Sequence, residues 1–445
     1  MQFLFKKTKI SYWVAWIALF IPLIGNAQND EENRLESATL EDIIQYALKH
    51  QPEVKQAQID EEITEQAIKG KLADWYPQIN FNYNYQRYID LQSSVIGGQV
   101  IRFGVNNTSS AQFTATQNVF NRDALLASKT ASKVRIQASQ NTSRSKIDVA
   151  VDVTKAVYDV LATMQQIKVS EESIIRLNQS LKDAKNRYVS GVSDKTDFQR
   201  ATILVRNAEA TLKSNTESLK YKKEYLKALM GYPQGEDFIL QYDEELMESE
   251  ILLDTAEQVN YSSHIDYKII QTQRELQKAN LKYSKWAFLP SVNLFGAYNL
   301  NYQNNNFGDL YNTRYPYSYV GATLSLPLFQ GGKRLAKVQE EKWASSRLDL
   351  SLVNLENNLN TAYVSAISSY KSNLALYLAQ KENVELAQEV YDIIQLQYTN
   401  GVKTYLDVTT SESELRTTRI NYFNALYLVL ASKVDVQHAL GQINY

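Results

Sequence analysis

The stretch PQINFNYNYQ, residues 77–86, alternates between apolar and polar side chains without a break. Successive side chains of a β-strand point to opposite faces, so the alternation predicts a strand with two unlike faces. One face would be apolar and rich in aromatic rings, carrying Ile79, Phe81, Tyr83 and Tyr85. The other would carry only Asn and Gln. Such a strand is typical of a half-buried soluble sheet or of a membrane barrel.

The alternation recurs in three more segments, QFTATQNVF (112–120), SVNLFGAYNLNYQ (291–303) and YVGATLSLPLF (319–329). We therefore predict strands at about 78–89, 111–120, 291–303 and 318–329, each long enough to cross a membrane at a tilt. One such segment alone would favour a soluble sheet, but four with Asn, Gln, Thr and Ser on the polar side favour a barrel. Aromatic residues stand at the strand entrances, where an aromatic girdle would lie: Trp75, Tyr76, Trp286 and Phe288.

Four strands are too few to close a barrel, because the smallest outer-membrane barrels have about 8. An open sheet edge cannot be satisfied in hydrocarbon, so other copies of the chain must supply the missing strands. Two copies would give about 8 strands and three about 12. The segments inside each strand pair, 89–110 and 304–318, read as long loops facing the outside.

The first 27 residues have the layout of a secretory signal, with lysines, then a short apolar run, then Gly-Asn-Ala before Gln28. The chain has 0 Cys, 3 His, 4 Met and a formal net charge of −2. This composition argues against disulfides, a soft-metal site and a nucleic-acid partner. No arrangement typical of an enzyme stands out, and we expect no catalytic residue, no cofactor and no bound metal.

Long helical segments make up most of the remaining chain. Residues 123–188 and 333–398 contain no Pro and no Gly, and their apolar residues recur at spacings of three or four. At ~1.5 Å rise per residue each would be a rod of roughly 100 Å, packed in the manner of a coiled coil. A short turn and a second helix follow each rod, at 194–229 and 404–440, and helical runs at 40–74 and 255–286 lead into the strands.

The two halves of the chain read as an internal repeat. RYVSGVSDKTDF (187–198) corresponds to QYTNGVKTYLDV (397–408), and ALMG (228–231) corresponds to HALG (438–441). We expect a first repeat at 28–239, a linker at 240–254 and a second repeat at 255–445. The acidic cluster in and beside the linker, Glu244, Glu245, Glu248 and Glu250, reads as a solvated surface.

These features resemble the TolC family of outer-membrane efflux proteins over nearly the whole chain after the signal. The most specific motifs are the two turns, RYVSGVSDKTDFQRA and QYTNGVKTYLDVTTSE, and the strand exit LPLFQGGKR (326–334). The resemblance implies an α+β membrane protein that forms a homotrimer. Its 12-stranded β-barrel would lie in the outer-membrane lipid of a Gram-negative bacterium, continuous with a 12-helix α-barrel in the periplasm.

The resemblance also implies roles for residues of the hairpin tips, at 188–195 and 398–405. Asp407 matches the aspartate ring of the pore constriction, and Thr410 stands where some members have a second aspartate. Tyr398 and Lys403, with Asp197 and Thr196, match the links that close the gate. A periplasmic adaptor would contact the tips at Gly191, Val192, Gly401 and Val402. From the residues alone, Asp407 and Asp197 could equally be helix caps.

The implied function is a passive exit duct of a tripartite efflux pump, served by the adaptor and an inner-membrane RND or ABC transporter. Two alternatives stay open. The duct could be the outlet of a type I protein secretion system, because the family uses one architecture for both. A periplasmic coiled-coil scaffold or adhesin would share the signal and the rods, but it would not need four alternating strands.

Overall fold

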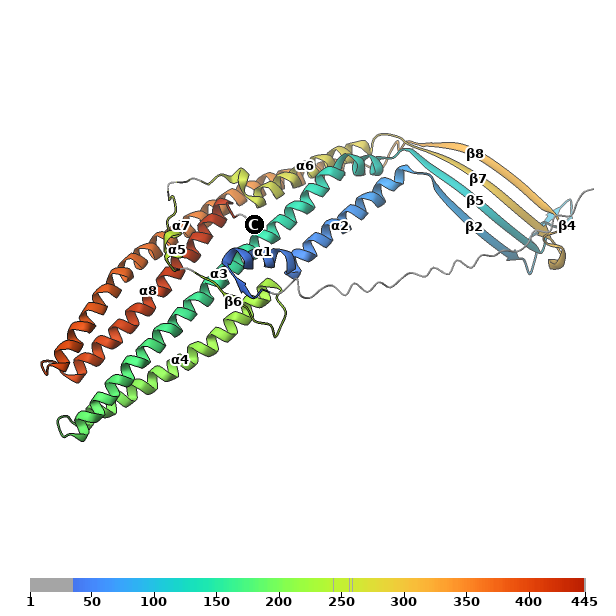
Figure 1. The fold of residues 1–445 in the computed structure, drawn as a ribbon. Coiled ribbons are helices and arrows are strands. Elements are labelled where there is room, and N and C mark those ends of the chain that lie inside the picture. Colours follow the sequence, from blue (N-terminus) through green and yellow to red (C-terminus); the bar gives the residue numbers. More distant parts are fainter. Residues whose placement is uncertain (1–34, 243, 256, 258, 444–445) are drawn as a thin grey trace, which may run out of the picture.

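The computed structural model describes residues 35–242, 244–255, 257 and 259–443, so the expected signal at 1–27 lies outside the described residues. The molecule is elongated, with a curved sheet at one end and the tips of two helical hairpins at the other (Figure 1). The sheet has the order β2-β5-β7-β8, and each neighbouring pair is antiparallel. Its strands are β2 (Gln78–Arg87), β5 (Asn107–Phe120), β7 (Ser291–Asn304) and β8 (Arg314–Ser325).

The register of the sheet sorts its side chains into one apolar and one polar face. Phe81 pairs with Phe113, which pairs with Tyr298, and the two phenylalanine rings lie 4.8 Å apart. On the opposite face, Asn82 pairs with Gln112, which pairs with Asn299. The apolar face is left uncovered by this chain, as shown by Ile79 at 75% exposure and Val320 at 90%. A contiguous apolar surface of this kind needs a partner, either protein or lipid.

The bounds of two strands differ from the prediction by more than two residues. β8 begins at Arg314 and ends at Ser325, so the expected range of 318–329 lies too far toward the C-terminus. The strand contains Pro316, which is tolerated because β8 is an edge strand and pairs only with β7. It ends just before Pro327, which could not donate to the sheet. β5 begins at Asn107, earlier than expected, and therefore shortens the first loop.

That first loop contains a small hairpin that the sequence did not lead us to expect. β3 (Ser93–Ile96) pairs with β4 (Gln99–Arg102), and the turn between them consists of Gly97 and Gly98, both with positive φ. A two-residue turn of this type matches the twist of its strands and requires positive φ at both positions. The second loop holds the short helix η4 (Phe307–Asp309).

Four helices form the two hairpins. In the first, α3 (Arg122–Val189, 68 residues) packs against α4 (Lys195–Met230), and in the second, α7 (Lys333–Thr399, 67 residues) packs against α8 (Tyr405–Leu440). The hairpins also touch each other, chiefly through α3 and α8. At ~1.5 Å per residue the two long helices extend for roughly 100 Å.

Three shorter helices complete the route into the sheet: α1 (Leu40–His50), α2 (Pro52–Leu72) and α6 (Ile265–Trp286). The expected continuous run at 40–74 is wrong, because Gln51 is extended and caps α2 while Pro52 occupies its first position. The short helix η2 (Ala73–Trp75) follows α2. The run expected from residue 255 begins only at Ile265, after the short helix η3 (Tyr261–Ser263).

The segment between the halves packs on the helices. β1 (Ser37–Ala38) pairs in parallel with β6 (Ile239–Leu240), and α5 (Glu244–Ser249) follows. Glu248 forms an ion pair with Lys381 at 2.5 Å and accepts a hydrogen bond from Tyr422. The interpretation of the acidic cluster as a solvated surface is therefore wrong for Glu248, which fixes α5 to both helices of the second hairpin.

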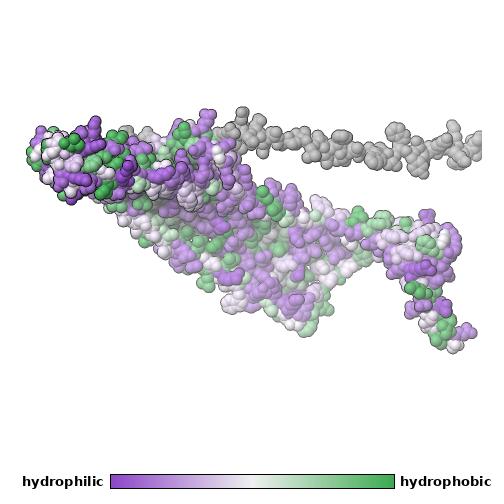
Figure 2. Space-filling view, turned by 90° about the horizontal axis from the view of Figure 1, so that it is seen from below, coloured by the Kyte–Doolittle hydropathy of each residue, from purple (hydrophilic) through white to green (hydrophobic). Residues whose placement is uncertain are grey.

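The surface of the helical part is mostly hydrophilic, with small scattered apolar patches (Figure 2). No helix in the described part of the chain combines the length and apolar character that crossing a membrane requires. The main apolar core lies instead between the helices, where Leu161 and Leu226 of the first hairpin meet Leu426 and Leu430 of the second. Each of these four side chains is at most 1% exposed.

Candidate functional site at the hairpin tips

The two hairpin tips have the same backbone geometry. Gly191 has a φ of 74° and Gly401 a φ of 77°, just beyond the ends of α3 and α7. In each tip the next N–H bonds back into the helix, from Val192 to the Arg187 carbonyl at 2.9 Å and from Val402 to the Gln397 carbonyl at 2.8 Å. This is the Schellman ending of a helix, which glycine fits because it has no Cβ to clash.

A hydrogen-bonded cap starts each return helix. Asp194 caps α4 by accepting from the Thr196 N–H at 3.4 Å. Thr404 and Asp407 form a reciprocal cap on α8. The Thr404 hydroxyl accepts from the Asp407 N–H at 3.3 Å, and Asp407 Oδ2 accepts from the Thr404 N–H at 2.9 Å. Asp197 stands at the same helical position of α4 as Asp407 does of α8.

The cap explains the charge state of Asp407. Hydrogen bonds from the Thr404 side chain and backbone lower the pKa of its carboxyl, and the nearby Lys403 charge adds to the effect. Asp407 is therefore ionised at neutral pH, as a ring of pore carboxylates would require. The helix-capping role is present in this chain, while the position of Asp407 at a constriction stays a prediction.

Tyr398 sits where the two hairpins meet. It is 7% exposed and packs with Ala184 and Ala201 of the first hairpin and with Tyr405 and Val408 of the second. The Arg187 guanidinium lies 4.4 Å from the centre of its ring. Burial raises the pKa of the Tyr398 phenol, and the Asp197 carboxylate adds to this increase. A gate link between Tyr398 and Asp197 stays a prediction.

The other two expected gate residues are not joined within this chain. Lys403 and Thr196 are both exposed, and in the described residues the Lys403 ammonium makes no ion pair and no hydrogen bond, although the Lys403 N–H donates to the Gln397 carbonyl at 3.4 Å. The Tyr398 hydroxyl likewise has no hydrogen-bond partner among the described residues. A link from these groups to a second copy of the chain stays a prediction.

A buried polar contact deeper in the molecule was missed by our sequence analysis. Glu412 of α8 is 4% exposed and accepts a hydrogen bond from the Ser173 hydroxyl of α3 at 2.5 Å. Arg176, one turn further along α3, lies 3.4 Å from the same carboxylate oxygen and 5.8 Å from the Tyr391 ring centre. The sequence did carry a signal for this contact, because the charged Glu412 falls between Val408 and Leu415 on the buried face of α8.

Polar pairs continue along the seam between α3 and α8. Gln166 donates to Asn424 at 2.7 Å, and ion pairs join Glu172 to Arg419 and Lys155 to Asp435. The seam thus combines these polar pairs with the apolar core in which Leu161 of α3 meets Leu426 and Leu430 of α8.

Comparison with known proteins assigns the chain to a family. The family model described as "Outer membrane efflux protein" matches residues 43–232 and 269–442. The chain belongs to this family of outer membrane efflux proteins. Outer membrane protein TolC of Vibrio cholerae is 22% identical over 427 residues, covering 91% of both chains. The solvent efflux pump outer membrane protein SrpC of Pseudomonas putida is 21% identical over 320 residues, covering 68% of this chain and 64% of its own.

Solved structures show the same fold. CusC superimposes with a TM-score of 0.74 at 15% identity, covering 90% of this chain and 91% of its own. The open state of the MtrE outer membrane channel of Neisseria gonorrhoeae gives 0.72 at 17% identity, covering 90% and 88%. The outer membrane efflux family is a transport family, not an enzyme family, and this member is an outer-membrane protein with a TolC-like channel fold.

Proposed function

We propose that the protein is the passive outer-membrane duct of a tripartite efflux pump. It would export small molecules as a homotrimer, with a barrel of three four-stranded sheets and a periplasmic tunnel built from the helical hairpins. The sheet carries the proposal, because it has one apolar face, one amide-rich face and two unpaired edges, β2 and β8. Unpaired edges are not tolerated in hydrocarbon, so the sheet must continue into other copies of the chain.

Cysteine crosslinking tests the assembly, because the chain has 0 native Cys. Asn80 and Asn82 lie on the polar face of β2, and Thr323 lies on the polar face of β8. One cysteine replaces Asn80 or Asn82, and a second cysteine replaces Thr323. We expect oxidation in native outer membranes to give covalent dimers and trimers only when the chain carries both cysteines. A protein that stays monomeric and water-soluble without detergent would overturn the proposal.

The hairpin tips would form the periplasmic entrance. Asp407 would line its constriction, and Tyr398 and Lys403 would bond to Asp197 and Thr196 to hold it closed. Gly191, Val192, Gly401 and Val402 would meet the adaptor, which would connect the duct to an RND or ABC transporter. The exposure of Val192 (73%) and Val402 (72%) supports this contact, because the described part of the chain leaves these apolar side chains largely uncovered at the extreme tips.

A double variant tests the gate. Tyr398→Phe keeps the buried ring and removes only the hydroxyl, which has no hydrogen-bond partner in the described chain, and Lys403→Ser removes an exposed charge. Neither change disturbs packing within the chain, so only links to a neighbouring copy can be lost. We expect a higher single-channel conductance in planar bilayers. Unchanged conductance would remove both residues from the gate.

The outlet of a protein secretion system is the second candidate, because one duct can serve both tasks. Neighbouring genes for a proton-driven pump or for an ABC exporter would separate the two. Membership in an efflux family and the four-stranded sheet disfavour the periplasmic scaffold or adhesin.

A further inference from the structure

We propose that the polar face of the sheet holds a binding site for neutral ring molecules that carry hydroxyl groups, such as sugars and glycosides. The site is formed by Tyr315 and Tyr317 of β8 beside the amide side chains of β7. It rests on the proposed function, because this face must line the lumen of the barrel for cargo to reach it.

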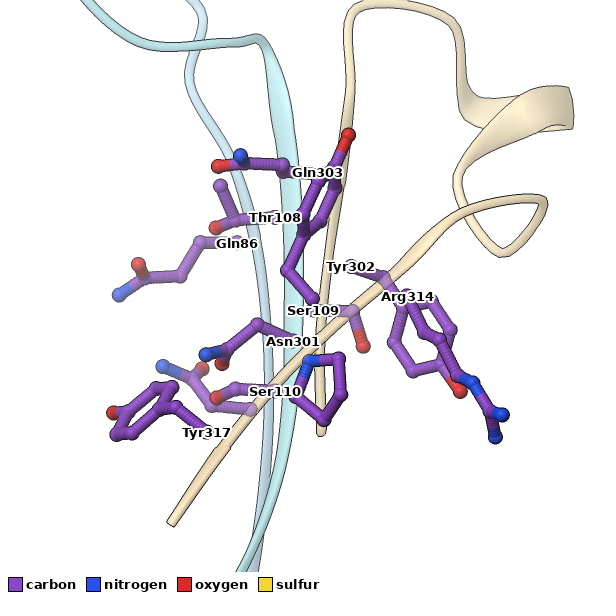
Figure 3. Close-up of a pocket in the computed structure, with 12 residues that line it drawn as sticks. Gln86, Thr108, Ser109, Ser110, Asn301, Tyr302, Gln303, Arg314 and Tyr317 are labelled. Atoms are coloured by element: carbon purple, nitrogen blue, oxygen red, sulfur yellow. The ribbon is translucent and has the colours of Figure 1, made fainter. Parts of the chain in front are cut away.

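The face is hollowed at this place. A cavity of about 650 Å³ lies over the loop-side ends of all four strands of the sheet. Figure 3 shows Gln86, Thr108, Ser110, Asn301, Gln303 and Tyr317 projecting to one side of the strands, while Tyr302 and Arg314 project to the other. The hollow side is therefore lined by uncharged hydrogen-bonding groups and by tyrosine rings.

Aromatic residues form a row on this otherwise amide-rich face. Tyr315, Tyr317 and Tyr319 follow one another at every second position of β8, and their side chains are 48%, 51% and 45% exposed. Phe295 extends the row by lying over Gly321, where an added Cβ would come within 2.6 Å of the ring. The row runs for roughly 20 Å along the strand. By contrast, the same face of β2 (residues 78–86) and of β5 (residues 108–116) carries no aromatic ring.

The rings of the row pack chiefly on one another, with Tyr317 stacked on Tyr319 at 6.3 Å and Phe295 edge-on to Tyr319 at 6.1 Å between ring centres. They are about half exposed, and the apolar face that would meet lipid is the opposite one. Directly across from Tyr317 in the register, Asn299 is 2% exposed, and its Nδ2 has no hydrogen-bond partner among the residues that the structure describes. Asn299 lies beneath the site, and the amides that line the cavity itself are those of Asn84, Gln86, Asn301 and Gln303.

The available chemistry selects the ligand class. Arg314 is the one charged residue in the lining of the cavity, and its side chain projects to the other side of the strands, so an ion would find no counter-charge on the hollow side. Amides and hydroxyls can exchange hydrogen bonds with hydroxyl groups, and tyrosine offers a flat apolar surface with a polar end. A sugar ring has a matching apolar face and a rim of hydroxyls. A planar aromatic compound could stack on the rings but would leave the surrounding amides unused.

Single-channel recording on the full-length protein tests the site, with maltohexaose added on the barrel side. We expect brief blockages of the current, with an affinity that falls about fivefold in Tyr317→Ala because a ring contact is lost. Tyr317→Phe should keep the blockage, since it keeps the ring. Tyr298→Ala is the matched control, because Tyr298 lies on the opposite face of the neighbouring strand with a similar exposure of 47%.

The outcomes separate this inference from the proposed function. A channel that conducts but is not blocked by maltohexaose overturns the sugar site and leaves the duct intact. The same holds if the control variant loses as much affinity as Tyr317→Ala. Blockage by ethidium that depends on Tyr317, without blockage by the sugar, would replace the ligand class with planar aromatic compounds. A protein that forms no conducting pore at all removes both proposals together.

Discussion

Gly191 and Gly401 hold the tips in a left-handed backbone conformation that other residues adopt only at a cost. We expect Gly401→Ala to lower the free energy of unfolding by about 1 kcal/mol, measured by thermal unfolding in detergent. Gly70 provides a matched control, since it lies inside α2 with ordinary φ and open space around it. Gly70→Ala should raise stability by about 1 kcal/mol, because alanine favours helices. Equal effects of both substitutions would contradict the turn geometry.

The cap on α8 makes stability depend on pH. The pKa of Asp407 is lower in the folded protein than its usual value, so the ionised carboxylate stabilises the folded state. This stabilisation is fully present above the usual pKa. The contribution is lost as the pH falls through the lowered, folded value. Thr404→Val removes the hydroxyl of the cap, so we expect a lower unfolding temperature at neutral pH. The difference from the wild type should shrink below about pH 4.

Thr404→Ser is the control for this prediction, since serine caps a helix as well as threonine does. It should behave as the wild type over the whole pH range. A deficit of Thr404→Val that persists undiminished in acid would show that packing, and not the cap, is responsible.

At the scale of elements, the seam between α3 and α8 contains one buried carboxylate, that of Glu412. Glu412→Ala would leave Arg176 half-enclosed without its partner, and breaking such a pair costs about 3 kcal/mol. We expect lower stability together with a higher channel conductance, because the second hairpin is released from the first. Unfolding in detergent and bilayer recording measure the two effects.

Replacing both partners separates charge from packing. The double variant Glu412→Met and Arg176→Met fills the same space with apolar side chains, so most of the stability should return. If the double variant is as unstable as Glu412→Ala, the pair does not act through its charges.

Elements defined by a regular period could be predicted from the sequence, and those defined by contacts between distant segments could not. Alternation identified the segments that form β2, β5, β7 and β8, and the absence of Pro and Gly identified α3 and α7. The early start of β8 was missed, because Pro316 is acceptable only where no neighbouring strand needs its missing N–H, and that depends on the whole sheet. The division into two repeats and a linker stays a prediction.

The same distinction holds at the candidate site. Both glycine turns and both helix starts were visible in the sequence, since turns and caps are local. The contact between Ser173 and Glu412 joins residues 239 positions apart, so no local pattern points to it. Links between copies of the chain, which the resemblance implies for Tyr398 and Lys403, lie beyond what one chain contains.

At the scale of the whole molecule, we expect opening of the proposed duct to separate the two hairpins along the seam between α3 and α8. Gln166 and Asn424 face each other across the seam, with their side chains 2.7 Å apart. Cysteines at both positions, joined by a short bismaleimide, would tie the first hairpin to the second. We expect the tied protein to conduct poorly and to export no substrate, because the tips can no longer part.

The matched control ties two helices of the same hairpin. Asp159 of α3 and Lys222 of α4 also lie within hydrogen-bonding distance, at 2.8 Å, and the same reagent can join cysteines at these positions. This link leaves the seam between the hairpins free, so conductance and export should match those of the wild type. If the tie across the seam leaves export intact while the crosslink is complete, opening does not require α3 and α8 to separate. The gate would then have to lie entirely within the two tips, at Tyr398 and its neighbours.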